Sequence, residues 1–275
     1  MYSPEIPWRL ARFLVRTLTL AGVIVYAGLA LFGCVAADRM IFQPQPASYD
    51  RLPGLRQVPA ADGTPLAVVS LPRPDARLTV FYFHGNAEDL GESLPLLQQL
   101  QSAGFAVLAF DYRGYGRSGG HPSESNVYAD TRTVLDYART NLGLKPEQLL
   151  VIGRSVGGGP AVELAANTRV AGLVLISPFL SAFRVVTKVK LLPFDRFDNL
   201  AKIGRIHCPL LVIQGTADEV IPFSHGQGLF AAASPPKRSD WIAGAGHNDI
   251  FEVAGARILL DIREFAQSLP VVAHP

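Results

Sequence analysis

The stretch "LLVIGRSVGGGPAVELAA", residues 149–166, contains the clearest indication of the fold. It begins as a short, nearly continuous apolar run, which is typical of a strand buried on both faces of a sheet. The run ends at Ser155, with Gly153 before it and Gly157 to Gly159 after it, and a helical pattern follows. Glycines are needed at such a turn because side chains would clash where the two backbones converge. We therefore expect Ser155 to stand exposed over the sheet, between a strand and a helix.

The same apolar pattern recurs along the chain and alternates with helical patterns. Further buried strands are predicted at residues 78–85, 105–114, 172–178 and 209–218, and residues 55–71 predict two strands joined at Asp62-Gly63. Helices are predicted at residues 92–102, 125–141, 160–166 and 253–268. This alternation predicts an α/β fold with a mostly parallel central sheet, helices on both faces, and ligands bound at the carboxyl ends of the strands.

The composition narrows the classes of function. The chain has 275 residues, of which 49% are hydrophobic and 17% charged, as expected for one sizeable domain plus an unusually apolar segment. A net charge of +2, without a basic run interleaved with aromatic residues, argues against a nucleic-acid partner. The two cysteines, Cys34 and Cys208, form no Cys-x-x-Cys pair, so neither a zinc site nor a disulfide framework is indicated. With no cofactor motif present, we predict no metal and no cofactor.

The unusually apolar segment is Thr17 to Ala37, which contains no charged residue. As a helix rising about 1.5 Å per residue, this segment is roughly 30 Å long, about the thickness of a bilayer's hydrocarbon core. Arg9, Arg12 and Arg16 precede it, and positive charge tends to stay cytoplasmic. We therefore predict a single-pass membrane anchor with the remainder of the chain on the extracytoplasmic side.

The apolar segment also fits a lipoprotein signal or a cleaved secretory signal. "LFGC" at residues 31–34 resembles a bacterial lipoprotein cleavage box that would lipidate Cys34, although Phe32 is bulky for that box. A cleaved secretory signal has a similar charged start and apolar stretch. In all three cases residues 1–39 form the anchor or signal segment, and residues 40–275 form a domain outside the cytoplasm.

Residues 153–157 fit Gly-x-Ser-x-Gly, the pattern of a serine held on a sharp strand-to-helix turn. A serine hydroxyl needs a base to take its proton, and the base needs an orienting carboxylate; on such a fold these follow the serine in the order acid, then histidine. Asp218 lies just beyond a predicted strand, with Glu219 beside it as the weaker candidate, and His247 lies in a glycine-flanked loop before the last helix. We therefore predict a triad of Ser155, Asp218 and His247.

Acyl transfer through a serine also requires donors for the oxyanion. The backbone N–H of Val156 is one candidate, at the start of the helix after Ser155. The loop "HGNA" at residues 84–87 could present a second, from Asn86 or Ala87. The sequence does not separate these two amides.

Taken together, the motifs resemble those of the serine α/β-hydrolases. The resemblance runs from about Arg39 to Leu269 and is carried by "DRMIFQP", "HGNAEDLG", "FDYRGYGRSGG", "GRSVGGG", "QGTADEVIP" and "GAGHND". The chain looks most like the membrane-anchored branch that includes depalmitoylating α/β-hydrolase-domain thioesterases, and like the serine aminopeptidase-like group. The resemblance implies the same triad and oxyanion donors near Asn86 and Val156. It does not extend to substrate, because the chain has one apolar helix where the mammalian depalmitoylases carry a cysteine cluster.

Residues 179–202 are too few for a full cap domain, and they predict a helix and loop over an accessible site. Phe179 and Phe183 could line an acyl-binding groove there, although an ordinary amphipathic helix with a solvated basic face would show the same pattern. We predict a serine hydrolase of esters or thioesters, with a small-molecule or acyl-lipid substrate and an acyl-serine intermediate. The alternatives are a peptidase or amidase with the same triad, and a catalytically silent membrane-anchored scaffold.

Overall fold

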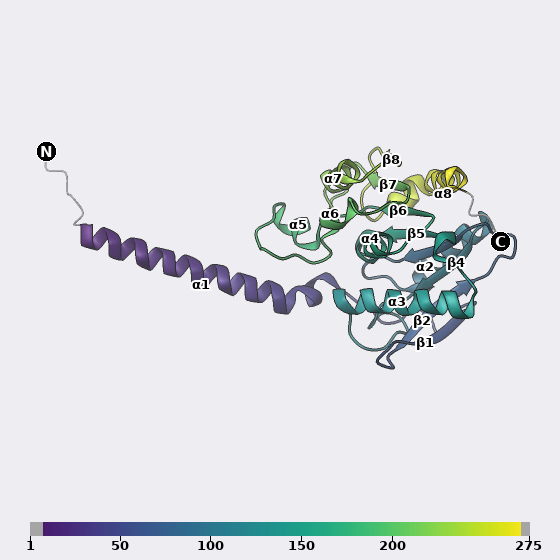
Figure 1. Ribbon diagram of the computed structural model, residues 1–275, viewed down its shortest axis with the longest axis horizontal. Coiled ribbons are helices and arrows are strands. Elements are labelled where there is room, and N and C mark those ends of the chain that lie inside the picture. Colours follow the sequence, from purple (N-terminus) through teal and green to yellow (C-terminus); the bar gives the residue numbers. More distant parts are fainter. Residues whose placement is uncertain (1–7, 271–275) are drawn as a thin grey trace. The chain divides into compact units, whose positions relative to one another are not determined.

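The computed structural model describes residues 8–270, and its elements are labelled in Figure 1. The strands are β1 (Leu55–Pro59), β2 (Pro65–Leu71), β3 (Thr79–Phe83), β4 (Ala106–Phe110), β5 (Leu149–Arg154), β6 (Gly172–Ile176), β7 (Leu210–Gly215) and β8 (Lys237–Ile242). The α-helices are α1 (Trp8–Ile41), α2 (Leu90–Ser102), α3 (Glu124–Asn141), α4 (Gly158–Asn167), α5 (Ala182–Thr187), α6 (Asn199–Ile203), α7 (Ser224–Ala232) and α8 (Ile250–Ser268). Residues up to Met40 and residues from Ile41 form two compact units.

The described part of the first unit is helical and lies within α1, a helix of 34 residues that contains the predicted apolar segment and extends beyond it at both ends. It is long and apolar enough to cross a membrane, and nearly all of its most apolar stretch is exposed. The hydroxyls of Thr17 and Thr19 donate to the carbonyls of Phe13 and Val15 one turn earlier. These hydroxyls are therefore satisfied within the helix, as polar groups in a lipid environment must be.

The second unit is built on one sheet with the strand order β1-β2-β4-β3-β5-β6-β7-β8. β1 pairs antiparallel with β2, and β2 pairs antiparallel with β4. The other six strands, β4, β3, β5, β6, β7 and β8 in their order across the sheet, are parallel to one another. The predicted mostly parallel sheet is confirmed, and the loops that follow β3, β5, β7 and β8 all leave the same edge of it.

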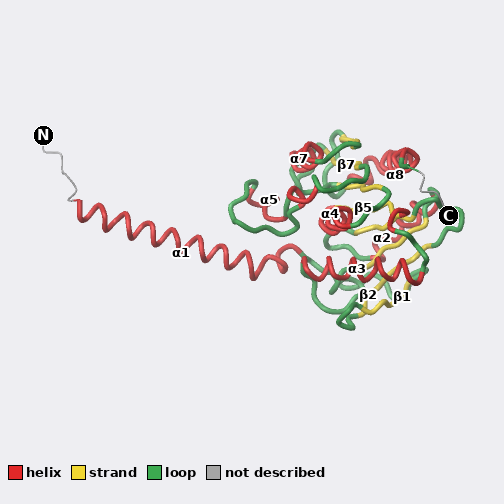
Figure 2. Tube along the Cα trace, viewed as in Figure 1, coloured by secondary structure: helices red, strands yellow, loops and turns green. Residues whose placement is uncertain are grey.

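Helices cover both faces of this sheet because its strands carry apolar side chains on both faces. On one face Phe81 and Phe83 belong to a core that includes residues of α3, α4 and α7. On the other face Val80 and Tyr82 pack in a second core with residues of α2 and α8. Figure 2 shows the strands in yellow between the red helices. The layered arrangement predicted from the alternating pattern is therefore confirmed.

Some elements differ from those predicted. α2 begins at Leu90 rather than Glu92, because the Asp89 carboxylate caps the helix by accepting from the N–H groups of Gly91 and Glu92. β8 was not predicted: it is an edge strand of sequence "KRSDWI" that pairs only with β7, so it lacks a continuous apolar run. α7 was not predicted either, since two glycines in "SHGQGLFAA" lower its helical propensity.

The segment between β6 and β7 forms two short helices and a loop, where one helix and a loop were predicted. α5 has only six residues, and a loop then leads to α6. The ring of Phe197 fills the space over Gly159, where a Cβ would come within 2.2 Å of it. The Phe197 N–H donates to Glu124 at 2.7 Å, and Lys202 forms an ion pair with Glu163 at 2.8 Å. The second half of this segment, from Phe197 to Lys202, is thus held against α3 and α4 by a hydrogen bond and an ion pair.

Candidate active site

Ser155 occupies a sharp turn between β5 and α4. Its φ is +51°, in the left-handed region that costs a non-glycine residue energy. A Cβ on Gly157 would lie 2.3 Å from the carbonyl oxygen of Phe83, and one on Gly153 would lie 2.6 Å from the carbonyl oxygen of Gly157. The turn is therefore pressed against the end of β3, and both flanking positions exclude any side chain.

The structure brings together the three residues predicted as a triad. Ser155 Oγ lies 3.0 Å from His247 Nε2, and His247 Nδ1 lies 2.9 Å from Asp218 Oδ2. The three side chains come from the ends of β5, β7 and β8, at the same edge of the sheet. With an ionised Asp218, His247 Nδ1–H donates to the carboxylate, and Nε2 is then free to accept the proton of Ser155.

The surroundings of Asp218 favour its charged form. Oδ1 accepts from the N–H groups of Ile221 at 2.7 Å and Val220 at 3.1 Å, while Oδ2 faces His247. Burial alone would raise the pKa of this carboxyl, but the His247 and backbone hydrogen bonds outweigh burial and hold the pKa below its usual value. Glu219, the weaker acid candidate, instead accepts from the His247 backbone N–H at 3.2 Å.

The loop after β3 lies beside Ser155. A Cβ on Gly85 would lie 3.7 Å from Ser155 Cβ. The Asn86 side chain is occupied: its Oδ1 accepts from Gln43 N–H and the Tyr115 hydroxyl, and its Nδ2 donates to the Ile41 carbonyl. The Asn86 side chain is therefore not available to an oxyanion, and the donors that remain in this loop are the backbone N–H groups of Asn86 and Ala87.

The remaining oxyanion candidates differ in setting. Ala87 is exposed and has a φ of +55°, so its backbone is held in a strained turn. Val156 is 7% exposed and lies at the start of the turn that leads into α4. The geometry leaves both loop amides as candidates, as the sequence did.

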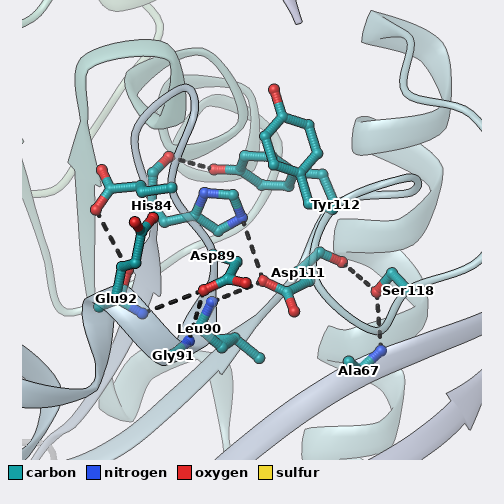
Figure 3. Close-up of polar contacts among 12 residues, drawn as sticks. Ala67, His84, Asp89, Leu90, Gly91, Glu92, Asp111, Tyr112 and Ser118 are labelled. Atoms are coloured by element: carbon teal, nitrogen blue, oxygen red, sulfur yellow. Dashed lines mark hydrogen bonds and ion pairs between the residues drawn. The ribbon is translucent and has the colours of Figure 1, made fainter. Parts of the chain in front are cut away.

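A buried polar network contacts this loop (Figure 3). Asp111 is fully buried after β4; its Oδ1 accepts from Leu90 N–H at 2.8 Å and its Oδ2 accepts from the Tyr49 hydroxyl at 2.5 Å. His84 Nε2 lies 3.8 Å from Asp111 Oδ1, and the His84 ring stacks on Tyr112. Burial raises the pKa of the Asp111 carboxyl. The network fixes the backbone at both ends of the loop that carries Asn86 and Ala87.

The two phenylalanines predicted to line a groove lie in different settings. Phe179 is only 3% exposed and packs edge-on against Phe197 in the core. Phe183 is half-buried on α5 and packs edge-on against Phe194. Little of the Phe179 ring is thus available to a ligand in this conformation, and Phe183 remains the more accessible of the two.

The chain is similar to known hydrolases in sequence and structure. Residues 74–201 match the family described as serine aminopeptidase, S33. α/β-hydrolase domain-containing protein 17B of Homo sapiens is 43% identical over 181 residues, and its counterpart in Xenopus tropicalis is 44% identical; each match covers 64% of this chain and 62% of the relative. The chain therefore spans less than two thirds of the length of these relatives.

Solved structures agree on the fold. An esterase of Pyrococcus furiosus superposes with a TM-score of 0.71 at 20% identity, covering 82% of this chain and 99% of the esterase. A monoacylglycerol lipase of Paleococcus ferrophilus superposes with a TM-score of 0.61 at 25% identity, covering 74% and 98% of the two chains. The fold that these proteins share with the chain is the one expected from its motifs.

Proposed function

Because this chain has the α/β-hydrolase fold and is similar to α/β-hydrolase domain-containing proteins, we propose that it is a serine hydrolase of carboxylic esters or thioesters. The observation that carries the proposal is the pair of contacts that links Ser155 Oγ to His247 at 3.0 Å and His247 to Asp218 at 2.9 Å. The proton of Ser155 Oγ thus has a direct path to His247 Nε2, while Asp218 orients the imidazole through Nδ1–H. Such a path activates a nucleophile that is otherwise weak.

The proposed reaction has two halves. His247 Nε2 takes the proton from Ser155 Oγ as the oxygen attacks the acyl carbon, and the carbonyl oxygen becomes an oxyanion facing Val156 N–H and the loop of Asn86 and Ala87. The tetrahedral intermediate collapses to an acyl-Ser155, and the alcohol or thiol leaves with the proton from His247. Water then repeats the sequence and releases the acid. Asp218 stays ionised throughout and keeps His247 in the productive tautomer.

Acyl esters and thioesters are favoured over peptides as substrates. Among similar structures are an esterase and a monoacylglycerol lipase. A peptidase or amidase with the same triad remains the second candidate, supported by the serine aminopeptidase family match, but it would need a group to receive a peptide terminus. A silent scaffold is disfavoured because all three triad residues are present and within hydrogen-bond distance.

A substrate panel tests this choice. We expect the purified chain to hydrolyse p-nitrophenyl esters from acetyl to palmitoyl, and acyl thioesters, much faster than aminoacyl p-nitroanilides of equal size. The acyl length with the highest kcat/KM would measure the depth of the acyl site. Cleavage of anilides as fast as of esters would instead favour the peptidase.

We also propose that α1 anchors the chain in a membrane with the catalytic domain on the extracytoplasmic side, as the arginines before the apolar segment favour. We expect Cys34→Ala to leave the full-length chain in the membrane fraction after alkaline carbonate extraction, because the span is held by its apolar surface. Loss of the variant from membranes, or accumulation of an unprocessed precursor, would favour lipidation at Cys34. A shortened, released wild-type chain would favour a cleaved signal.

A further inference from the structure

One ion pair links the loop after β3 to the turn that carries Ser155. Glu88 Oε1 accepts from Gly85 N–H at 2.6 Å and from Arg154 Nη1 at 3.0 Å. Both side chains are mostly buried, with 15% of Glu88 and 19% of Arg154 exposed. Gly85 directly precedes the two candidate oxyanion amides, and Arg154 directly precedes Ser155, so a single carboxylate oxygen spans the two halves of the oxyanion site.

Arg154 extends this contact to the third part of the site. Its guanidinium lies 5.4 Å from the centre of the Phe251 ring, near the start of α8 and shortly after His247. A guanidinium over an aromatic face is attracted to it. Arg154 thus contacts elements from the Gly85 loop and from the chain that leaves His247, and it belongs to the serine turn itself.

We propose that the Glu88–Arg154 ion pair positions the oxyanion loop against the Ser155 turn, so that the N–H groups of both converge on one oxygen. The inference rests on the proposed function and assigns Glu88 and Arg154 as positioning residues. Glu88 holds the Gly85 amide, and Arg154 holds Glu88. Because transition-state stabilisation depends on donors fixed before the reaction, small displacements of this loop should lower kcat.

The charges make the two partners unequal. A lone carboxylate at Gly85 would repel the negative charge that develops on the neighbouring oxyanion, and Arg154 neutralises it. Removing Arg154 therefore leaves the Glu88 carboxylate unneutralised beside the oxyanion, and it also removes the contact that holds the loop in place. Replacing Glu88 by glutamine removes the charge but keeps an oxygen that can accept from Gly85 N–H.

Four variants of the full-length chain test this reasoning through kcat and KM for one p-nitrophenyl ester. We expect kcat to fall about threefold in Glu88→Gln, about 30-fold in Glu88→Ala, and about 50-fold in Arg154→Gln, with KM within about twofold of wild type throughout. The double variant Glu88→Gln/Arg154→Gln should recover about tenfold over Arg154→Gln, since the uncompensated carboxylate is gone. Inhibition constants of an alkylboronic acid, which forms a tetrahedral adduct on the serine, should rise in step with the losses in kcat.

A matched control separates positioning from stability. Glu163 forms a comparably buried ion pair with Lys202, with 23% and 16% of the side chains exposed, between α4 and α6. Glu163→Gln should lower the unfolding midpoint as much as Glu88→Gln does and leave kcat and the boronic acid affinity within twofold of wild type. A Glu88→Ala variant with wild-type kcat, or a double variant slower than Arg154→Gln, would overturn the inference.

The same experiment distinguishes this inference from the function on which it rests. Ser155→Ala is measured alongside the four variants. Hydrolysis by the wild type that persists in Ser155→Ala would overturn the proposed function and the inference together. Hydrolysis that depends on Ser155 but not on Glu88 or Arg154 would overturn the inference alone.

Discussion

Ser155→Ala is expected to lower kcat for an activated ester on the order of a million-fold, as removal of a triad nucleophile does in serine hydrolases. The reason is that no covalent acyl intermediate can form without Oγ, and His247 then has no hydroxyl to deprotonate 3.0 Å away. The fold should survive, since alanine removes a single oxygen from the turn. Steady-state hydrolysis and thermal unfolding of the purified variant measure the two effects.

Ser177 offers a control matched in backbone and position. It follows the neighbouring strand β6 with a φ of +49°, close to the +51° of Ser155. Its buried hydroxyl has no hydrogen-bond partner in the described part of the chain. Ser177→Ala should therefore keep kcat within a few-fold of wild type. Equal losses in the two variants would point to damage of the sheet edge and would contradict a nucleophilic role for Ser155.

Asp218→Asn is expected to lower kcat about ten-thousand-fold at neutral pH. Oδ1 of Asp218 accepts from two backbone N–H groups, of Ile221 and Val220, so the carbonyl oxygen of an asparagine would keep that side. The asparagine NH₂ would then face His247 and donate to Nδ1. This forces the proton onto Nε2, where it prevents acceptance of the Ser155 proton.

Glu219 provides the comparison for this variant, because the sequence left it as a second candidate acid. Its carboxylate accepts from the backbone N–H of His247 and does not hold the imidazole ring, so Glu219→Gln should cost less than about tenfold. Rates of hydrolysis and of labelling by a fluorophosphonate should fall together in Asp218→Asn. A larger loss in Glu219→Gln than in Asp218→Asn would move the acid to Glu219.

The central strands of the fold could be predicted because burial on both faces requires nearly continuous apolar runs, as in β5 and β7. β8 was not predicted because it lacks an apolar run, which an edge strand with partly exposed side chains does not need. The start of α2 was misplaced by two residues, since the Asp89 cap shows itself only through its contacts with backbone N–H groups. Strand order was also hidden, because it depends on pairings between distant segments.

The candidate site likewise contains residues that the sequence could predict and residues that it could not. The triad residues could be proposed from sequence because a strand-to-helix serine and the order of its partners leave local motifs. Glu88 and Arg154 are separated by 66 positions, and Tyr49 and Asp111 by 62, and neither pair forms a motif. Such pairs are set by how the loops fold against one another. For this reason the residues that we propose as positioning groups became visible only in three dimensions.

Mapping a covalent adduct would establish directly whether Ser155 is the nucleophile. The full-length chain would be treated with a fluorophosphonate, and the adduct located by intact mass and peptide sequencing. We expect one adduct, on the serine within "GRSVGGG", and none in Ser155→Ala. An adduct on any other residue, equal labelling of Ser155→Ala, or no adduct on a folded, ester-hydrolysing wild type would contradict it.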